Sequence, residues 1–62
     1  MARYDTISVT VIAISGKAIK ITDGAQEEWI PKTLIEDAED LILGEVTDIS
    51  VQEWFLKEKG LL

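Results

Sequence analysis

The side chains that could do chemistry in this chain are carboxylates, lysines, hydroxyls and one tyrosine, because none of its 62 residues is a histidine or a cysteine. Histidine is the commonest general base and metal ligand, and cysteine supplies thiolate nucleophiles and thiolate metal ligands. A ligand pocket of about 300 Å³ or more also needs a longer chain than this. We therefore expect a protein that is not an enzyme and that has neither a cofactor nor a metal site.

The carboxylates are numerous, but their spacing does not form a site. Glu27 and Glu28 are adjacent in a segment of strand character, so their side chains would point to opposite faces of a sheet. The acidic run Glu36–Asp40 lacks the alternating oxygen ligands, central glycine and distal glutamate of a calcium loop. We expect this run to be a solvated surface loop.

Three lysines near a tryptophan form the candidate ligand-binding set, namely Lys17, Lys20, Trp29 and Lys32. Small β-barrels that bind single strands stack bases on exposed aromatic rings beside basic residues. The same lysines, together with Arg3, would also suit a small anion such as a nucleotide, held at a subunit interface. The opposing interpretation is that a core this small needs both of its largest side chains, and on that ground we expect Trp29 and Trp54 to be buried.

Four segments have the character of β-strands, and these are Thr6–Ile14, Lys17–Thr22, Gln26–Ile30 and Glu45–Ser50. The first shows period-two alternation that places one set of side chains on a single face: Ile7, Val9, Val11 and Ala13. Turns are expected at Ser15-Gly16 and Asp23-Gly24. This pattern predicts a small antiparallel β domain.

The stretch between the third and fourth strands is less regular. Pro31 has no N–H group, so we expect it at a sheet edge, a bulge or a strand end. Extended structure should resume at Lys32–Ile35. The apolar segment Leu41–Leu43 should form one turn of helix or a loop that plugs the core, and Gly44 should end it.

The C-terminal residues predict a short helix from about Val51 to Lys59. Ser50 and Glu53 have the spacing of a capping box, in which each side chain bonds the backbone N–H of the other residue. Gly60 is placed to end the helix in the left-handed conformation, followed by an apolar contact from Leu61. One helix face would bury Val51, Trp54 and Phe55.

Chain length predicts a single domain over residues 1–62 that needs help to be stable. A domain of this size buries only about 60% of its unfolded surface, and small proteins usually add disulfides, a metal or a partner subunit. Because cysteine and histidine are absent and 47% of the residues are hydrophobic, we expect a homo-oligomer. Its candidate contact residues are Ile12, Ile14, Leu61 and Leu62.

The net charge of −6, from twelve acidic and six basic residues, disfavours binding to nucleic acid. The N-terminal residues MARYDTIS have no apolar core typical of a signal peptide. The longest apolar run, Val9 to Ile14, is far too short to span a membrane. We expect a cytoplasmic protein with no membrane partner.

Three motifs in the chain form a recognisable pattern. They are Lys17-Ala18-Ile19, the central Trp29-Ile30-Pro31-Lys32-Thr33 with Ile35, and the ending Glu53-Trp54 through Lys59-Gly60-Leu61. With these motifs the chain resembles short proteins encoded by phages and prophages, in which a proline usually stands where this chain has Gln52. The resemblance covers most of the chain. It implies a small SH3-like or OB-like β-barrel in the cytoplasm of a bacterial host, and it carries over no catalytic residues.

We thus expect a mainly β fold, a small SH3-like or OB-like, partly open antiparallel barrel of four to five strands with a C-terminal helix at about residues 51–59. Small phage proteins of this kind often act as accessory factors, which implies a non-enzymatic binding protein. It would antagonise host defence by sequestering a nucleotide signal or by blocking a defence protein. Two alternatives stay open, namely a small barrel that binds single-stranded nucleic acid and a structural or assembly protein.

Overall fold

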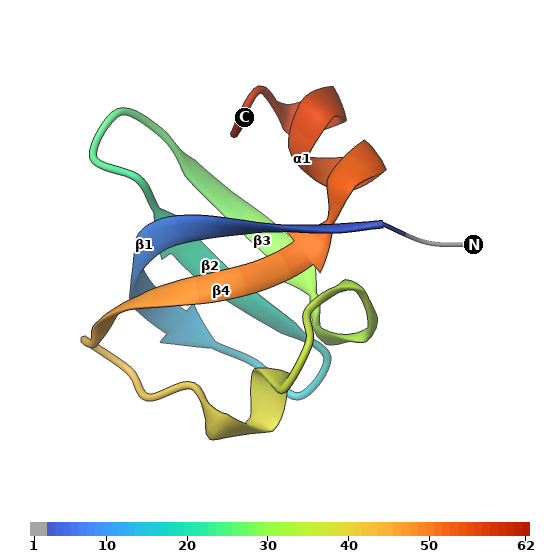
Figure 1. The fold of residues 1–62 in the computed structure, drawn as a ribbon. Helices are drawn as coiled ribbons and strands as arrows, with labels where there is room; N and C mark the ends of the chain where they lie inside the picture. Colours follow the sequence, from blue (N-terminus) through green and yellow to red (C-terminus); the bar gives the residue numbers. More distant parts are fainter. Residues whose placement is uncertain (1–2) are drawn as a thin grey trace.

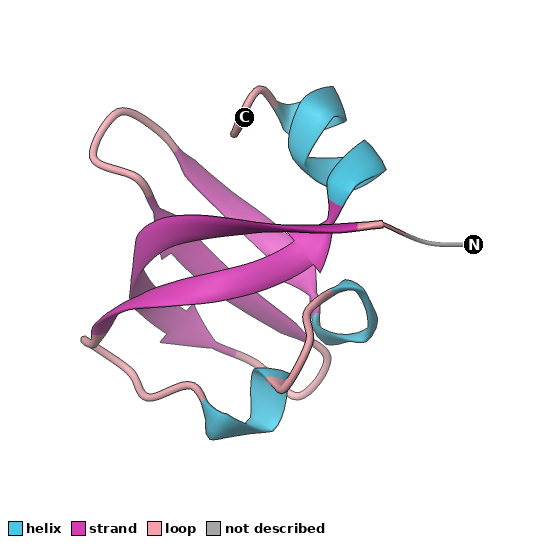
Figure 2. Cartoon of the chain, viewed as in Figure 1, coloured by secondary structure: helices cyan, strands magenta, loops and turns pink. Residues whose placement is uncertain are grey.

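The computed structural model describes residues 3–62, and the predicted mainly β fold is confirmed. The elements in chain order are β1 (Tyr4–Ile14), β2 (Ala18–Thr22), β3 (Glu27–Pro31), the 3-10 helices η1 (Lys32–Leu34) and η2 (Ala38–Asp40), β4 (Val46–Gln52) and the α-helix α1 (Glu53–Lys59). Figure 2 shows the strands of the sheet together with the short helices that follow β3 and β4. The predicted domain also included residues 1–2, which lie outside the described residues.

The four strands form one antiparallel sheet in the order β3-β2-β1-β4. β1 bends, so that the sheet folds into two layers and β1 belongs to both (Figure 1). The first half of β1 pairs with β4, from Tyr4 opposite Gln52 to Thr10 opposite Val46. Its second half pairs with β2, from Thr10 opposite Thr22 to Ile14 opposite Ile19. The two pairings overlap at Thr10, and the folded sheet encloses the core between its layers.

A β-bulge at Ile12 accompanies the bend, because the register between β1 and β2 shifts between Val11 and Ala13. An extra residue in one strand reverses the side-chain alternation beyond it. Ile7, Val9 and Val11 therefore face the core as predicted, but Ala13 lies opposite Lys20 on the outer face of the sheet. The prediction that Ala13 shares a face with Val11 was wrong, because sequence alternation does not reveal a bulge.

The segment after β3 turns towards β4 and partly covers its edge. Lys32–Leu34 forms η1 instead of the predicted extended structure, since the N–H of Ile35 bonds the C=O of Lys32 at 3.1 Å. Ile35 alone is extended, and it forms an isolated bridge with Val51 of β4. Pro31 is the last residue of β3, an edge strand, which agrees with its missing N–H donor.

The C-terminal helix exists as predicted, but α1 begins at Glu53 rather than at Val51. β4 continues through Gln52, because the ladder with β1 extends to Tyr4 and the N–H of Glu53 still bonds the C=O of Arg3 at 2.7 Å. The predicted capping box was wrong, since Ser50 lies within β4 and its hydroxyl contacts that of Thr6 at 3.1 Å.

The other end of α1 follows the prediction. Gly60 adopts the left-handed conformation with φ of 71°, and the N–H of Leu61 bonds the C=O of Leu56 at 2.9 Å. Leu61 then packs against the core. At the first turn, a hydrogen bond between the side chains of Asp5 and Glu53 raises the pKa of Asp5, which donates the shared proton, and lowers the pKa of Glu53, which accepts it.

Aliphatic side chains from both layers form the core, with Phe55 and Leu56 of α1 covering one side. Both tryptophans lie outside it, with 46% of Trp29 and 54% of Trp54 exposed, so the prediction that they are buried was wrong. Leu56, which was not among the residues expected to be buried, is the fully buried side chain of α1. Leu41 packs against the core and acts as the predicted plug, while Ile42 and Leu43 are exposed.

Candidate functional site

The hairpin of β2 and β3 brings together two of the predicted ligand-binding residues. Lys20 lies directly opposite Trp29 in the ladder, and the Lys20 ammonium is 5.9 Å from the centre of the Trp29 ring. Both side chains point away from the core because their neighbours Ile19, Ile21 and Ile30 point into it. We call this exposed surface the hairpin face; its residues are Ala18, Lys20, Thr22, Glu27, Trp29 and Pro31.

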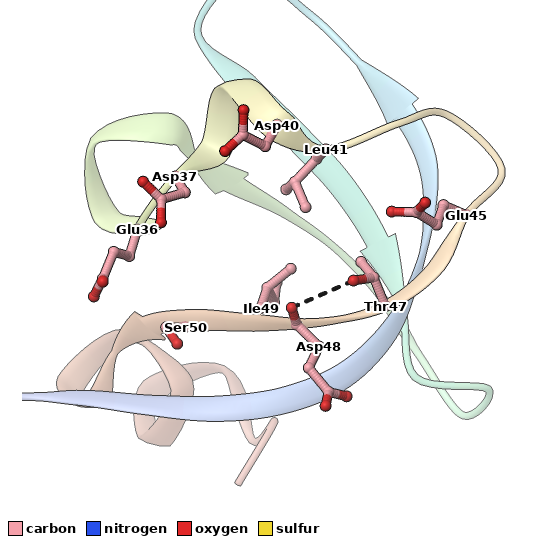
Figure 3. Close-up of a pocket in the computed structure, with 9 residues that line it drawn as sticks. All are labelled: Glu36, Asp37, Asp40, Leu41, Glu45, Thr47, Asp48, Ile49 and Ser50. Atoms are coloured by element: carbon pink, nitrogen blue, oxygen red, sulfur yellow. Dashed lines mark hydrogen bonds between the residues drawn. The ribbon is translucent and has the colours of Figure 1, made fainter.

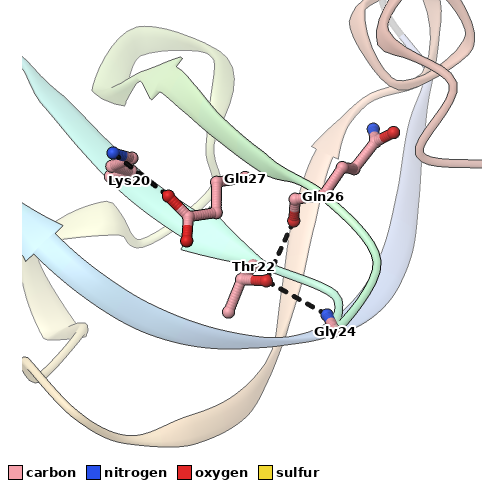
Figure 4. Close-up of polar contacts among 5 residues, drawn as sticks. All are labelled: Lys20, Thr22, Gly24, Gln26 and Glu27. Carbon is pink, nitrogen blue, oxygen red and sulfur yellow. Dashed lines mark hydrogen bonds and ion pairs between the residues drawn. The ribbon is translucent and has the colours of Figure 1, made fainter.

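Glu27 provides a second contact for the same lysine. One carboxylate oxygen of Glu27 lies 3.2 Å from the Lys20 Nζ atom, and both side chains reach solvent (Figure 4). Glu28 lies opposite Ile21 on the other side of β3. The predicted separation of the two adjacent glutamates is therefore confirmed, and only Glu27 belongs to the hairpin face.

The loop that joins β2 to β3 is held by its own polar side chains. Thr22 accepts a hydrogen bond from the N–H of Gly24 at 3.1 Å and donates one to the C=O of Gln26 at 2.9 Å (Figure 4). One Asp23 oxygen accepts bonds from the N–H groups of Ala25 and Gln26 at 2.8 and 2.9 Å. These backbone donors, that of Gln26 first, lower the pKa of Asp23 because they stabilise its ionised form.

The remaining predicted bases lie at other places. The N–H of Lys32 bonds the C=O of Lys17 at 2.9 Å, so these two residues are neighbours at the far end of the hairpin. Lys32 begins η1 and lines a shallow hollow of about 410 Å³ with residues of η1 and η2. Arg3 lies beside the first residue of α1, because its C=O accepts a hydrogen bond from the N–H of Glu53.

The four candidate oligomer contacts differ in exposure. Ile14 and Leu62 are exposed, with 42% and 58% of their surface accessible. Ile12 lies half-buried at the bulge, and Leu61 is half-buried against the core. Leu61 therefore already has an intramolecular role, whereas Ile14 and Leu62 remain free to contact a second molecule.

A second concave surface, which the sequence does not predict, runs along β4 (Figure 3). We call it the β4 groove; it has a volume of about 230 Å³ and is lined by Glu36, Asp37, Asp40, Leu41, Glu45, Thr47, Asp48, Ile49 and Ser50. Leu41 and Ile49 point towards each other across the groove, with Asp37 and Asp40 on one side of Leu41 and Glu45 on the other, while the Asp48 carboxylate points away. The sequence showed the acidic loop, but the approach of that loop to β4 is a long-range contact.

The floor of the β4 groove includes an open strand edge. β4 pairs with β1 on one side only, and on its other side the N–H of Glu36 bonds the C=O of Ser50 at 2.8 Å. Backbone groups of alternate strand residues face the same edge, so those of Val46 and Asp48 face outward as well. The Asp48 carbonyl has a long 3.5 Å contact from the Thr47 hydroxyl (Figure 3). An extended segment could bond to this edge.

The comparisons with known proteins add no relative: no family model matches the chain, and neither a curated protein nor a solved structure matches it. Within residues 3–62 no group of three or more acidic side chains is arranged to hold a metal ion. None of the helices in that part of the chain has the length and apolar character needed to cross a membrane.

Proposed function

We propose that this protein acts by binding rather than by catalysis, and that the hairpin face holds a ligand that combines an aromatic ring with negative charge, as a nucleotide does. The observation that carries the proposal is the exposed Trp29 ring with the Lys20 ammonium 5.9 Å from its centre. Every nucleobase has a flat π-face that stacks on such a ring, and a nearby cation attracts the phosphate.

The exposure of Trp29 is itself costly and therefore informative. Full burial of a large apolar side chain contributes about 1.5–3 kcal/mol, and the chain has only two tryptophans, its largest apolar residues. Nearly half of Trp29 is nevertheless in solvent, beside the small side chains of Ala18 and Pro31 on the same face. A flat, partly apolar platform with one cation suits a ring-bearing ligand.

The biological role that we propose is that of a phage-type accessory protein in the bacterial cytoplasm. It would antagonise host defence by sequestering a nucleotide signal. The support is the resemblance to short phage and prophage proteins, whose central motif includes Trp29 and Lys32. Single-stranded nucleic acid is the less favoured ligand, because a net charge of −6 repels a polyanion.

The β4 groove supports a second candidate function, which is to block another protein, such as a host defence protein. An extended segment can add to an open strand edge, and the carboxylates around the groove favour a segment that carries lysine or arginine. Such a partner would protect the outward N–H groups of Val46 and Asp48 from hydrogen exchange. A nucleotide on the hairpin face would leave their exchange unchanged.

The experiment that tests the main proposal is an NMR titration of the ¹⁵N-labelled protein with 3′,5′-cyclic AMP and, separately, with a ten-nucleotide thymidine strand. The two indole N–H signals report each tryptophan separately. We expect the Trp29 signal to shift with the cyclic nucleotide while the Trp54 signal, from a residue on α1, stays in place.

Variants sharpen the same test. Lys20→Met should lower the affinity for the cyclic nucleotide about fivefold, because the substitution removes the cation beside the ring. Lys57→Met makes the same change on α1 and should leave the affinity unaltered. A Trp29 signal that does not respond to any nucleotide would overturn the proposal, and a larger response to the thymidine strand would favour the nucleic-acid alternative.

A further inference from the structure

Glu27 is the nearest ionised neighbour of the only cation that contacts the Trp29 ring within residues 3–62. Its carboxylate lies 3.2 Å from the Lys20 Nζ atom, and the same Nζ atom is 5.9 Å from the ring centre. Glu27 and Trp29 both point outward from β3 because they are two residues apart. A ligand stacked on Trp29 that reaches for Lys20 therefore meets a negative charge already in place.

We propose that Glu27 restricts the charge of the ligand, so that the hairpin face accepts a planar ring with a single negative charge and rejects polyanionic nucleotides. This inference rests on the proposed function of the hairpin face. Lys20 and Glu27 together are neutral, so the first ligand charge must compete with Glu27 for the ammonium, and each further charge meets only repulsion. A cyclic mononucleotide carries one negative charge, whereas a nucleoside triphosphate carries about four.

The magnitude follows from the exposure of the pair. Side-chain exposure is 33% for Lys20 and 57% for Glu27, so water screens the interaction strongly. A single competing charge at this distance from a surface group should change affinity about threefold to fivefold. For a triphosphate the same repulsion acts on several charges, and the effect of removing Glu27 should be about tenfold or more.

The test compares two variants with the same change in net charge. Glu27→Gln removes the carboxylate beside Lys20, and Glu28→Gln removes the adjacent one, which lies opposite Ile21 on the other side of β3. Each protein is titrated with 3′,5′-cyclic AMP and with ATP at fixed ionic strength and without divalent cations. The Trp29 indole N–H signal reports binding directly, and thermal unfolding confirms that each variant is folded.

We expect the wild-type protein to bind cyclic AMP more tightly than ATP. Glu27→Gln should raise the affinity for cyclic AMP about threefold and the affinity for ATP about tenfold. Glu28→Gln should change each affinity by less than about twofold. Equal gains in both variants would overturn the inference, because they would show an effect of net charge alone. Tighter binding of ATP than of cyclic AMP by the wild-type protein would overturn it too.

The failure of the proposed function has a different signature. If the Trp29 signal responds to neither nucleotide in any of the three proteins, the hairpin face is not a nucleotide site, and the role of Glu27 falls with it. If the wild-type protein binds both nucleotides and Glu27→Gln changes neither affinity, the proposed function stands and only the role of Glu27 is overturned. Binding that is detected only in Glu27→Gln would overturn both, because the wild-type hairpin face would then accept neither nucleotide.

Discussion

Trp29 illustrates how a single position in a strand decides between core and surface. Its neighbour Ile30 is fully buried, and side chains alternate along β3, so the indole must point outward. The large size of tryptophan favours its burial, but the alternation of side chains along β3 outweighs this preference. A shift of the strand register by one residue would bury Trp29, but it would also expose Ile30 and bury Glu27. The exposed ring then becomes available to a ligand.

Asp23 fixes the turn beneath the hairpin face through its charge as well as its geometry. Its pKa lies below the ordinary value of 3.8, because its carboxylate accepts two backbone N–H bonds. A lowered pKa contributes stability that is present above the unfolded value and is lost as the pH falls through the folded value. The turn should therefore weaken in acid.

We predict that Asp23→Asn loses less stability than the wild-type protein between pH 7 and pH 3. Asparagine keeps an oxygen for the two backbone N–H groups but carries no titrating charge. The measurement is urea unfolding of both proteins at the two pH values, with Asp23→Ala as the control that lacks the acceptor at either pH. A wild-type protein and an asparagine variant that respond equally to acid would contradict the assigned role of the charge.

The helix α1 shows how the boundary between two elements selects the side chains that are buried. The β1–β4 ladder continues to Gln52, so Val51 is a buried strand residue and α1 begins two residues later than predicted. The buried residues of α1 are then Phe55 and Leu56, while the Trp54 indole N–H bonds the Gln52 side chain at 2.8 Å on the surface.

Leu56→Ala should destabilise the protein far more than Trp54→Ala, although tryptophan is the larger residue. Leu56 is fully buried, and removal of a buried leucine side chain costs about 2–5 kcal/mol. Trp54→Ala removes an exposed ring, its surface hydrogen bond to the Gln52 side chain and an edge contact with Phe55 that contributes about 1 kcal/mol. Thermal or urea unfolding measures the difference, and a Trp54→Ala variant that is the less stable of the two would show that α1 packs differently.

The whole molecule exposes many apolar side chains for its size. Among the described residues eight large ones are exposed: Tyr4, Ile14, Trp29, Ile42, Leu43, Val46, Trp54 and Leu62. The loop with Ile42 and Leu43 lies beside the bend of β1, because the N–H of Gly44 bonds the C=O of Val11 at 2.7 Å. Apolar residues that gather on a surface mark an interaction site, and the homo-oligomer expected from the sequence stays a prediction.

We predict that the protein is oligomeric in solution and that Ile14→Asp converts it to a monomer, because a charge at a buried apolar contact must be desolvated. Size-exclusion chromatography with light scattering measures the mass directly. Thr33→Asp, an equal change at an exposed residue of η1, should leave the oligomer intact. A wild-type protein that elutes as a monomer at about 100 µM would show that the prediction of a homo-oligomer is wrong.

Part of the candidate site could be predicted from the sequence. Lys20 and Trp29 were expected to lie near each other, because a hairpin turn at Asp23-Gly24 pairs the strands around it. Glu27 could have been added by the same alternation, since it shares a face with Trp29. The β4 groove could not be predicted, because it depends on the packing of Glu36–Asp40 against a strand that follows later in the chain.

Local patterns were enough to predict the four strands, the turn at Asp23-Gly24 and the glycine that ends α1, because alternation, turn residues and left-handed backbone are properties of a few neighbouring residues. Pairing within the two hairpins settled the bulge at Ile12 and the outward position of Trp29, and the long-range pairing of β4 with β1 settled the late start of α1. Each of these depends on which backbone groups a partner strand binds, and a ladder of hydrogen bonds can outweigh the preference of any one side chain.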